Sequence, residues 1–424
     1  MANSFSKEER VAFENLLEGF QDALVLSRNV AVYTTDQTMM ERTNNVIWRP
    51  QPNIAVSYSG VDMTANFDDY TQLSVPATIG FPRSVPWIMN ATELRDALQE
   101  QRLGDAAKQK LASDINVAVM NVATAQGTLF VKRTGVASGF DDVAEIESVM
   151  NEQGVPGTDR YLALSTRDYN GMASDLAKST RSFGNDISDN ALRRAFVGRV
   201  ASFETYKLDY SVRKAAAAGG AGLTISTLPA ANNFWVPRAQ TVAATGEAAN
   251  IDNRFQTVTV SSTTNVAPGD SFTIANVFAV HHITKQSTGV LKTFRVIAVP
   301  SATTLVISAP IISNQGGSDA EAQYQNVTIP VTSATAAITF LNTAAAAMNP
   351  FWQKDAIEIL PGRYAVPTNA GAAVMRASTD QGIELVMTKQ YDIKTMKTLF
   401  RLDTLFGVVN KQPQMSGIIM FGQP

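Results

Sequence analysis

The sequence predicts an α+β protein into which an all-β domain is inserted. In the first half, apolar residues recur at helical spacing, most clearly in residues 13–24 and 111–122. Between Phe255 and Ala345 charges become rare, and short runs rich in Thr, Val, Ser and Ile alternate with turns, which is typical of a small antiparallel barrel or sandwich. Two small-residue runs, "KAAAAGGAGL" (214–223) and "NTAAAAMNP" (342–350), bracket this segment, as expected where one domain interrupts another.

The N-terminal elements are a helix followed by an extended segment. Ser6 and Glu9 form a capping-box pattern, and the apolar positions behind it predict an amphipathic helix from residue 6 to about 27. These positions are Phe13, Leu16, Leu17, Phe20 and Leu24. From residue 30 to 84, prolines punctuate short alternating runs, which indicates strands or a long hairpin. Its polar character suggests an arm that packs on another molecule.

The middle of the chain alternates between helix and strand signals. Asn90 and Glu93 can cap a long helix that ends at Gly127, with a break allowed near Gly104. A short helix is predicted at 141–151, and the run "RYLALSTRDYNGMASDLAKS" predicts a buried strand followed by a helix. Strand signals return after residue 354, so the α+β part resumes behind the insertion.

Composition bounds the class of protein. A chain of 424 residues is long enough for two or three folding units. Its 35 basic and 38 acidic residues nearly balance, so nucleic-acid binding is not expected to be the main function. The charged fraction of 17% is low, which suggests that much surface is buried against other copies. Cysteine is absent, which removes disulfides, thiolate metal sites and cysteine nucleophiles.

Targeting signals are not visible in the sequence. The N-terminal segment is polar and charged, unlike a secretory signal peptide, so residence in the cytoplasm is expected. Apolar runs are interrupted well before the roughly 20 residues of a membrane span. We therefore expect no membrane contact.

The glycines Gly219, Gly220 and Gly222 raise the question of a phosphate-binding loop. A dinucleotide site needs a strand before its glycines and a helix after them, whereas the strand-like "LTIST" follows here. A Walker-type motif is also absent. These glycines are therefore predicted to be hinge residues.

Ionisable residues do not form a recognisable catalytic or metal site. His281 and His282 are the only histidines, and as neighbours in a predicted strand they would point to opposite faces, one inward and one outward. Asp68 with Asp69, and Asp141 with Asp142, precede predicted turns or helix starts, where aspartate interacts with free backbone amides. A carbohydrate-active enzyme with a carboxylate pair nevertheless remains an alternative.

One cluster of basic and aromatic residues has two interpretations. It consists of Arg193, Arg194, Arg199 and Arg213 with Phe196, Phe203 and Tyr206. Such a mixture occurs on surfaces that bind nucleic acid, and equally in subunit contacts. Because the net charge is only −3, the interface or core interpretation is favoured.

Four stretches resemble the major capsid proteins of short-tailed enterobacterial phages, in matching order and spacing. They are "NNVIWRP" (44–50), "NIDNRFQTVTVSSTT" (250–264), "APGDSFTIANV" (267–277) and "NPFWQKDAIEI" (349–359). The resemblance implies the tailed-phage capsid fold named after Hong Kong 97, with an additional β-barrel insertion domain. It also implies a structural protein of the virion, without enzymatic activity, cofactor or metal.

The resemblance divides the chain into five parts. These are an N-terminal arm (1–48), an extended loop that reaches a neighbouring subunit (49–83), a peripheral domain with a spine helix that C-terminal strands complete (84–160), an axial domain with return strands (161–222 and 346–424), and the inserted barrel (223–345).

The resemblance also implies partners. In relatives, the coat protein assembles with a scaffolding protein into pentamers and hexamers of an icosahedral procapsid, which receives double-stranded DNA through a portal and expands. Acidic residues of the N-terminal arm contact the scaffolding protein, and Glu14 and Glu18 stand at the matching positions. A loop of the inserted domain contacts the neighbouring capsomer, and its counterpart at 239–252 carries Glu247 and Asp252. The alternative to a coat protein outside the enzymes is a β-rich phage tail or surface protein.

Overall fold

The computed structural model describes residues 5, 7–33, 46–64, 67, 70–90, 97–179, 197–208, 210–219, 222–365 and 371–424. The chain forms two compact units. The first comprises residues 1–47, 76–120 and 357–409, and the second comprises residues 48–75, 121–356 and 410–424.

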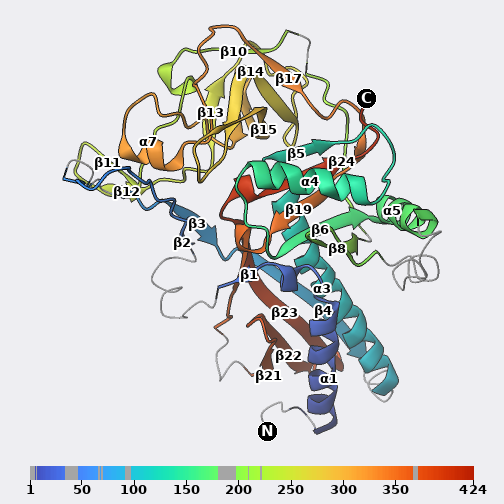
Figure 1. The fold of residues 1–424 in the computed structure, drawn as a ribbon. Coiled ribbons are helices and arrows are strands. Elements are labelled where there is room, and N and C mark those ends of the chain that lie inside the picture. Colours follow the sequence, from blue (N-terminus) through green and yellow to red (C-terminus); the bar gives the residue numbers. More distant parts are fainter. Residues whose placement is uncertain are drawn as a thin grey trace. The chain divides into compact units, whose positions relative to one another are not determined.

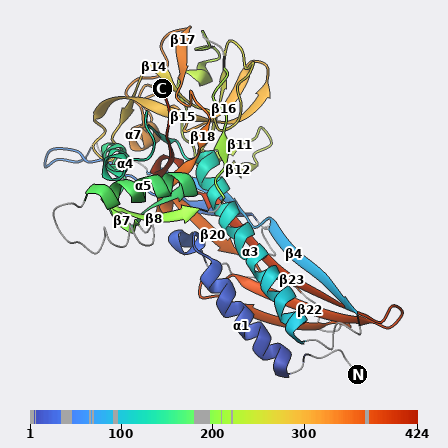
Figure 2. The same ribbon diagram turned by 90° about the vertical axis from the view of Figure 1, so that its right-hand side faces the viewer.

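Two helices of the first unit confirm the helical predictions. Helix α1 (Lys7–Ala23) buries the predicted apolar stripe at Phe13, Leu16 and Phe20. Helix α3 (Ala97–Gln126) is the longest and continues into the second unit. The break allowed near Gly104 was wrong, because the helix continues through this residue, and an added Cβ would lie 3.3 Å from Leu16 Cδ1. Gly104 thus permits close packing of α3 against α1 (Figure 2).

The sheet of the first unit is built from strands far apart in the chain. Its order is β1-β20-β23-β22-β21, and β4 pairs with β23. Trp87 of β4 stacks on Phe400 of β23 with ring centroids 5.5 Å apart. The bounds are β1 Ala31–Val32, β4 Phe81–Asn90, β20 Ile357–Pro361, β21 Ala373–Ser378, β22 Glu384–Asp392 and β23 Lys397–Asn410. Two further strands, β2 (Val46–Pro50) and β3 (Ser74–Thr78), pair with each other at the base of the extended loop.

A second six-stranded sheet lies at the centre of the second unit, in the order β5-β24-β19-β6-β8-β7. Strands β6 and β8 are parallel, with helix α5 between them in the chain. The buried side chains of this sheet share one core with those of helix α4. This core includes Val143, Ile146 and Phe351. The bounds are β5 Leu129–Lys132, α4 Phe140–Glu152, β6 Arg160–Ser165, α5 Thr166–Ser179, β7 Arg199–Val200, β8 Phe203–Leu208, β19 Asn349–Gln353 and β24 Ser416–Met420.

Both units combine segments that are distant in sequence. In the second unit β5 pairs with β24, and α4 shares the core of the second sheet, whereas β20 to β23 belong to the first unit. The expected domain boundaries remain a prediction. The amphipathic pattern of one segment does not reveal its pairing partner.

The inserted domain is a six-stranded barrel, as predicted (Figure 1). Its strands follow the order β10-β17-β14-β15-β16-β13, and a bridge between Ile225 and Val260 links the two edges. Buried Val, Ile, Leu and Phe side chains fill the interior. The bounds are β10 Thr224–Ile225, β13 Gln256–Thr259, β14 Ser271–Val280, β15 Ser287–Ser301, β16 Thr304–Ser308 and β17 Ala336–Phe340.

The insertion is a β domain, as predicted, and it contains one short helix in addition. This is α7 (Asp319–Tyr324), whose capping box joins Ser318 and Glu321. This Ser-x-x-Glu pattern was visible in the sequence and is a recognised start signal. Two small ribbons complete the second unit: the hairpin β11 (Gln240–Val242) and β12 (Ala248–Asn250), and the pair β9 (Arg213–Lys214) and β18 (Ala346–Ala347).

Candidate assembly surfaces and barrel junction

The exposed face of α1 carries the two glutamates that were predicted to bind a scaffolding protein. Glu14 and Glu18 are both exposed, on the opposite side from the buried Phe13 and Phe20. A spacing of four residues places them next to each other on the helix. The result is an acidic surface that a basic partner can approach.

The extended loop between β2 and β3 presents apolar side chains to solvent. Val61 and Phe67 are almost fully exposed, and Tyr58 and Tyr70 are about half exposed. Exposed apolar groups that cluster on one segment mark an interaction site more often than an ordinary surface. This segment is therefore the strongest candidate for contact with another protein chain.

The hairpin β11–β12 is exposed along its whole length and held only at its base. Glu247 lies in its turn and is exposed. Asp252, by contrast, forms an ion pair with Arg254 (Oδ2–Nη2 2.6 Å), and Arg254 also donates to the carbonyl oxygen of Asn410 at 2.8 Å. The Asp252 carboxylate thus contributes to fixing the hairpin base within its own subunit.

The two small-residue runs meet at the neck of the barrel. Strands β9 and β18 pair there, with Lys214 opposite Ala346. Lys214 Nζ lies 3.0 Å from Asp270 Oδ1, and the Asn342 amide donates to the same oxygen at 3.0 Å. A polar cluster thus joins the β9–β18 pair to the residue that precedes β14 of the barrel.

The predicted hinge glycines have different surroundings. An added Cβ at Gly219 would lie 2.4 Å from the ring of Phe340, so this glycine serves close packing. Gly222 has φ +89°, a conformation that favours glycine.

Two buried cations of β15 connect the barrel to residues at the ends of helices α3 and α4 and to the segment before β24. Lys292 Nζ contacts Gln153 Oε1 at 3.0 Å and Gln414 Oε1 at 2.9 Å, and its side chain is fully buried. Arg295 donates to the Thr124 carbonyl at 2.9 Å. Burial lowers the pKa of Lys292 to about 7 and that of Arg295 to about 10, with Asp270 opposing the shift at Arg295.

Sequence reasoning missed this junction. The available signal was the presence of two cations within one strand of a segment that is otherwise poor in charge. Burial of a charged side chain costs free energy unless the charge is paired or hydrogen-bonded. A charged residue in such a strand therefore marks a contact with another element.

The histidines follow β14 rather than lying in a strand, so the predicted placement in the barrel wall, one inward and one outward, was wrong. His282 is buried, while His281 is half-buried and accepts the Thr284 N–H at 3.2 Å. Burial and then the charge of Lys292 hold the pKa of His282 well below its usual value. Within the part of the chain that the structure describes, no cluster of three or more His, Asp or Glu residues could hold a metal ion.

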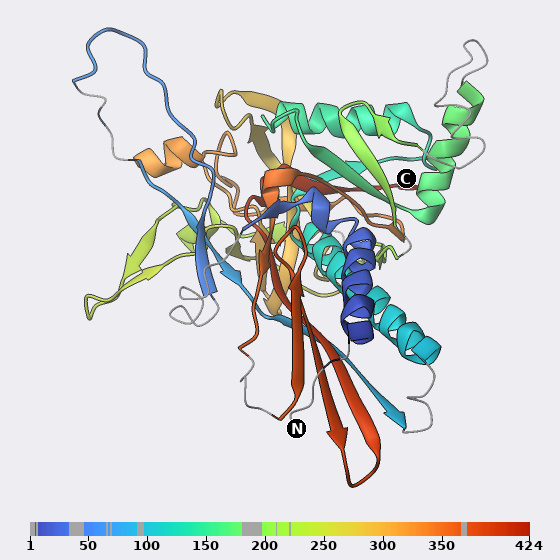
Figure 3. The ribbon, with the colours of Figure 1, turned by 90° about the horizontal axis from the view of Figure 1, so that it is seen from below.

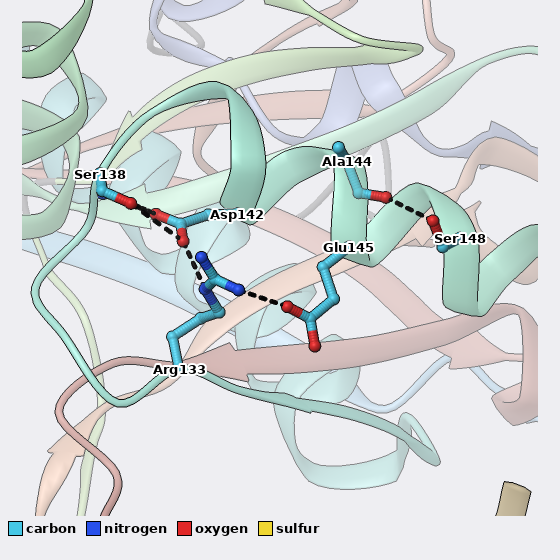
Figure 4. Close-up of polar contacts among 6 residues, drawn as sticks. All are labelled: Arg133, Ser138, Asp142, Ala144, Glu145 and Ser148. Carbon is cyan, nitrogen blue, oxygen red and sulfur yellow. Dashed lines mark hydrogen bonds and ion pairs between the residues drawn. The ribbon is translucent and has the colours of Figure 1, made fainter.

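The acidic pair Asp141 and Asp142 lies at the start of α4, as predicted. Figure 4 shows Asp142 with Arg133 and Ser138. Asp142 is buried and accepts the Arg133 Nε–H at 2.6 Å and the Ser138 N–H at 2.6 Å. Arg133 also contacts Glu145 at 2.5 Å. Asp141 is exposed. The two aspartates therefore serve the helix start and an ion-pair network, which offers no arrangement for acid–base catalysis.

Several residues singled out from the sequence lie outside the described residues, namely Ser6, Asp68, Asp69, Glu93, Arg193, Arg194, Phe196 and Gly220. The remaining members of the basic-aromatic cluster do not share one surface. Phe203 is buried, edge-on against Phe351 with centroids 6.5 Å apart, while Arg199 and Arg213 are exposed. Among the described residues of this cluster, Phe203 is a core residue, so the core interpretation holds for Phe203.

The sequence matches the model of one protein family over almost its whole length. A family model described as "P22 coat protein - gene protein 5" matches residues 1–422. With an α+β fold and an inserted β domain, this defines a major capsid protein of a tailed phage, a structural protein that forms the virion shell from many copies. The chain belongs to the P22 coat protein family. The tail or surface protein alternative is thereby set aside.

Solved structures give weaker likenesses. A structure from Mycobacterium phage Che8 is 10% identical, with 93% of this chain and 90% of that chain covered and a TM-score of 0.44. The capsid structure of Cyanophage P-SCSP1u is 11% identical over 92% and 85%, with a TM-score of 0.42. The CUS-3 coat protein I-domain is 36% identical over 29% of this chain and 99% of that chain, with a TM-score of 0.22. Among the described helices, none is long and apolar enough to cross a membrane.

Proposed function

We propose that this protein assembles with a scaffolding protein into pentamers and hexamers of an icosahedral procapsid, which takes up double-stranded DNA through a portal protein and then expands. Family membership supports the proposal. The observation that carries it within this chain is the extended loop with its exposed Tyr58, Val61, Phe67 and Tyr70. Water contact of these side chains is unfavourable by about 25 cal/mol per Å², and a neighbouring subunit would relieve it.

Production of the protein together with the neighbouring phage genes tests this function. We expect closed, uniform shells by electron microscopy, and soluble subunits or aberrant particles when the scaffolding gene is left out. Replacing Val61 and Phe67 by serine should shift the material toward unassembled subunits with an unchanged circular dichroism spectrum. Closed shells in normal yield from this double variant would contradict the role of the loop.

We place the scaffold contact at Glu14 and Glu18. Their joint replacement by lysine is expected to weaken binding of the scaffolding protein by roughly 1–2 kcal/mol at low salt, and less at high salt because exposed charges are screened. Co-sedimentation of subunit and scaffold at two salt concentrations measures the effect. Glu152, exposed near the end of α4, supplies the control Glu152→Lys. Equal weakening in the control would show that net charge, rather than this surface, governs binding.

Three finer roles belong to the same proposal. The hairpin β11–β12 contacts a neighbouring capsomer, with Glu247 as its exposed charge and Asp252 holding its base. Gly219, Gly220 and Gly222 let the barrel adjust to different neighbours, and the positive φ of Gly222 supports this. The packaged DNA makes weak, non-specific contact, which the net charge of −3 supports.

A further inference from the structure

Helix α7 of the barrel domain holds both ends of the extended loop. The Gln323 side chain accepts the Thr71 N–H at 3.2 Å through Oε1 and donates through Nε2 to Asn53 Oδ1. Tyr324 Oη donates to the Thr71 carbonyl at 2.9 Å. Two adjacent residues of one short helix thus bond to both ends of the extended loop, at Asn53 and Thr71. Figure 3 shows this helix beside the loop.

The same place contains a small apolar cluster. Leu73, Ile312 and Tyr324 are buried in it, and Ile54 and Trp235 pack against it. A cavity of about 30 Å³ remains beneath the loop ends, lined in part by Leu73, Tyr324 and Gln414. Because packing is incomplete there, we expect the hydrogen bonds from α7 to matter more than apolar contact for the position of the loop ends.

Helix α7 is itself firmly attached to the barrel. Lys285 Nζ donates to the carbonyl oxygens of Gln323 at 2.7 Å and Gln325 at 3.3 Å, at the C-terminal end of the helix, where a cation is favoured. The next residues bond to the barrel wall, since the Asn326 N–H donates to Ile312 and Val327 bridges to Ala279. A change in the position of the barrel is therefore passed to Gln323 and Tyr324.

We propose that α7 is the positioning element of the extended loop: the barrel, through Gln323 and Tyr324, sets the direction in which the loop leaves the subunit toward its neighbour. The proposal rests on the proposed function in so far as the loop contacts another subunit. The consequence is that barrel and loop ends move as one piece when a subunit adapts to its surroundings. The inserted barrel then has a role in every contact that the loop makes.

Hydrogen exchange on the unassembled full-length subunit tests the attachment. The double variant Gln323→Ala with Tyr324→Phe should speed exchange in residues 51–54 and 70–73 about tenfold or more, as expected when several hydrogen bonds are lost. Exchange in β14 and β15 should not change, which shows that the barrel remains folded. Asp319→Ala, on the exposed side of the same helix, is the matched control and should leave the loop ends protected. If the double variant unfolds the barrel, Tyr324→Phe alone removes a single hydroxyl and keeps the ring in the cluster.

Three results would overturn the proposal. The first is unchanged exchange at the loop ends in the variant, and the second is free exchange at the loop ends in the wild-type subunit. The third is a loosened loop in a variant that still forms shells of normal size and yield, because the direction of the loop would then not depend on α7. A failure of the proposed function looks different: wild type and Asp319→Ala would then both form no shells, whatever the exchange data show.

Discussion

The variant Gly417→Ala is expected to lose a large part of the stability of the second unit. Gly417 lies in β24, between β5 and β19. An added Cβ would lie 2.3 Å from the Leu129 carbonyl oxygen and 2.6 Å from Phe351 Cζ. The first contact is with backbone of a paired strand, which cannot move without breaking the ladder. Overpacking of this kind costs about 3 kcal/mol or more, a large part of the 5–15 kcal/mol that stabilises a typical protein.

Urea unfolding of the unassembled subunit, followed by tryptophan fluorescence, measures this loss. Gly135→Ala is the matched control, because its added Cβ meets nothing within 4 Å and no positive φ applies. We expect the control to stay within about 0.5 kcal/mol of wild type. Similar midpoints for Gly417→Ala and wild type would show that β5 and β24 can separate at little cost.

The second large effect concerns pH and Lys292. The pKa of this lysine falls from 10.5 to about 7 because it is buried. Between these two values the unfolded chain binds a proton that the folded chain does not, so stability due to this group rises with pH. Below pH 7 both states are protonated, and the full cost of burying the charge applies. The total change across the interval is on the order of 4–5 kcal/mol.

Lys292→Met removes the titrating group at similar length. We expect the difference in unfolding free energy, variant minus wild type, to be most positive at pH 6 and to decrease steadily toward pH 10. Denaturant unfolding at five pH values measures it. The loss of the bonds to Gln153 and Gln414 shifts the whole curve by about 1–3 kcal/mol but does not change its slope.

Lys132, which is exposed on β5, supplies the control Lys132→Met, whose difference from wild type should not depend on pH. Parallel profiles for wild type and Lys292→Met would mean that Lys292 keeps its charge in the folded protein, with solvent or another group compensating. The contribution of the Lys292 contacts to the unfolding free energy would then be the same at neutral and at alkaline pH. Because the comparison uses differences, groups common to all three proteins cancel.

Local patterns in the sequence predicted the elements well. The apolar stripe of α1, the long α3, the β6–α5 pair and the strands of the barrel all follow from spacing and composition. The errors have physical reasons. Gly104 indicated a helix break because the sequence does not show that α1 packs against this glycine. Helix α7 was missed because the composition of the surrounding segment is typical of strands.

The pairing of distant strands could not be predicted from local patterns. Strand β5 pairs with β24 across nearly three hundred residues of chain, and no local signal distinguishes that partner from others of the same pattern. Glu14, Glu18 and Glu247 remain predictions, since their partners are other molecules. Asp252 shows the limit of residue type alone, because its nearest cation, Arg254, is two residues away in its own chain.

By itself, the sequence determined which parts are helix, strand and insertion, because these depend on periodicity and composition within short windows. The small-residue runs at 214–223 and 342–350 also marked the boundaries of the barrel. Only the tertiary structure decided which residues the barrel contacts. These contacts are the hydrogen bonds of the buried Lys292 to two glutamines, the polar contacts of Asp270 at the β9–β18 pair, and the hydrogen bonds from α7 to the extended loop. These contacts join residues far apart in the chain, and their free energies depend on burial and geometry that exist only after folding.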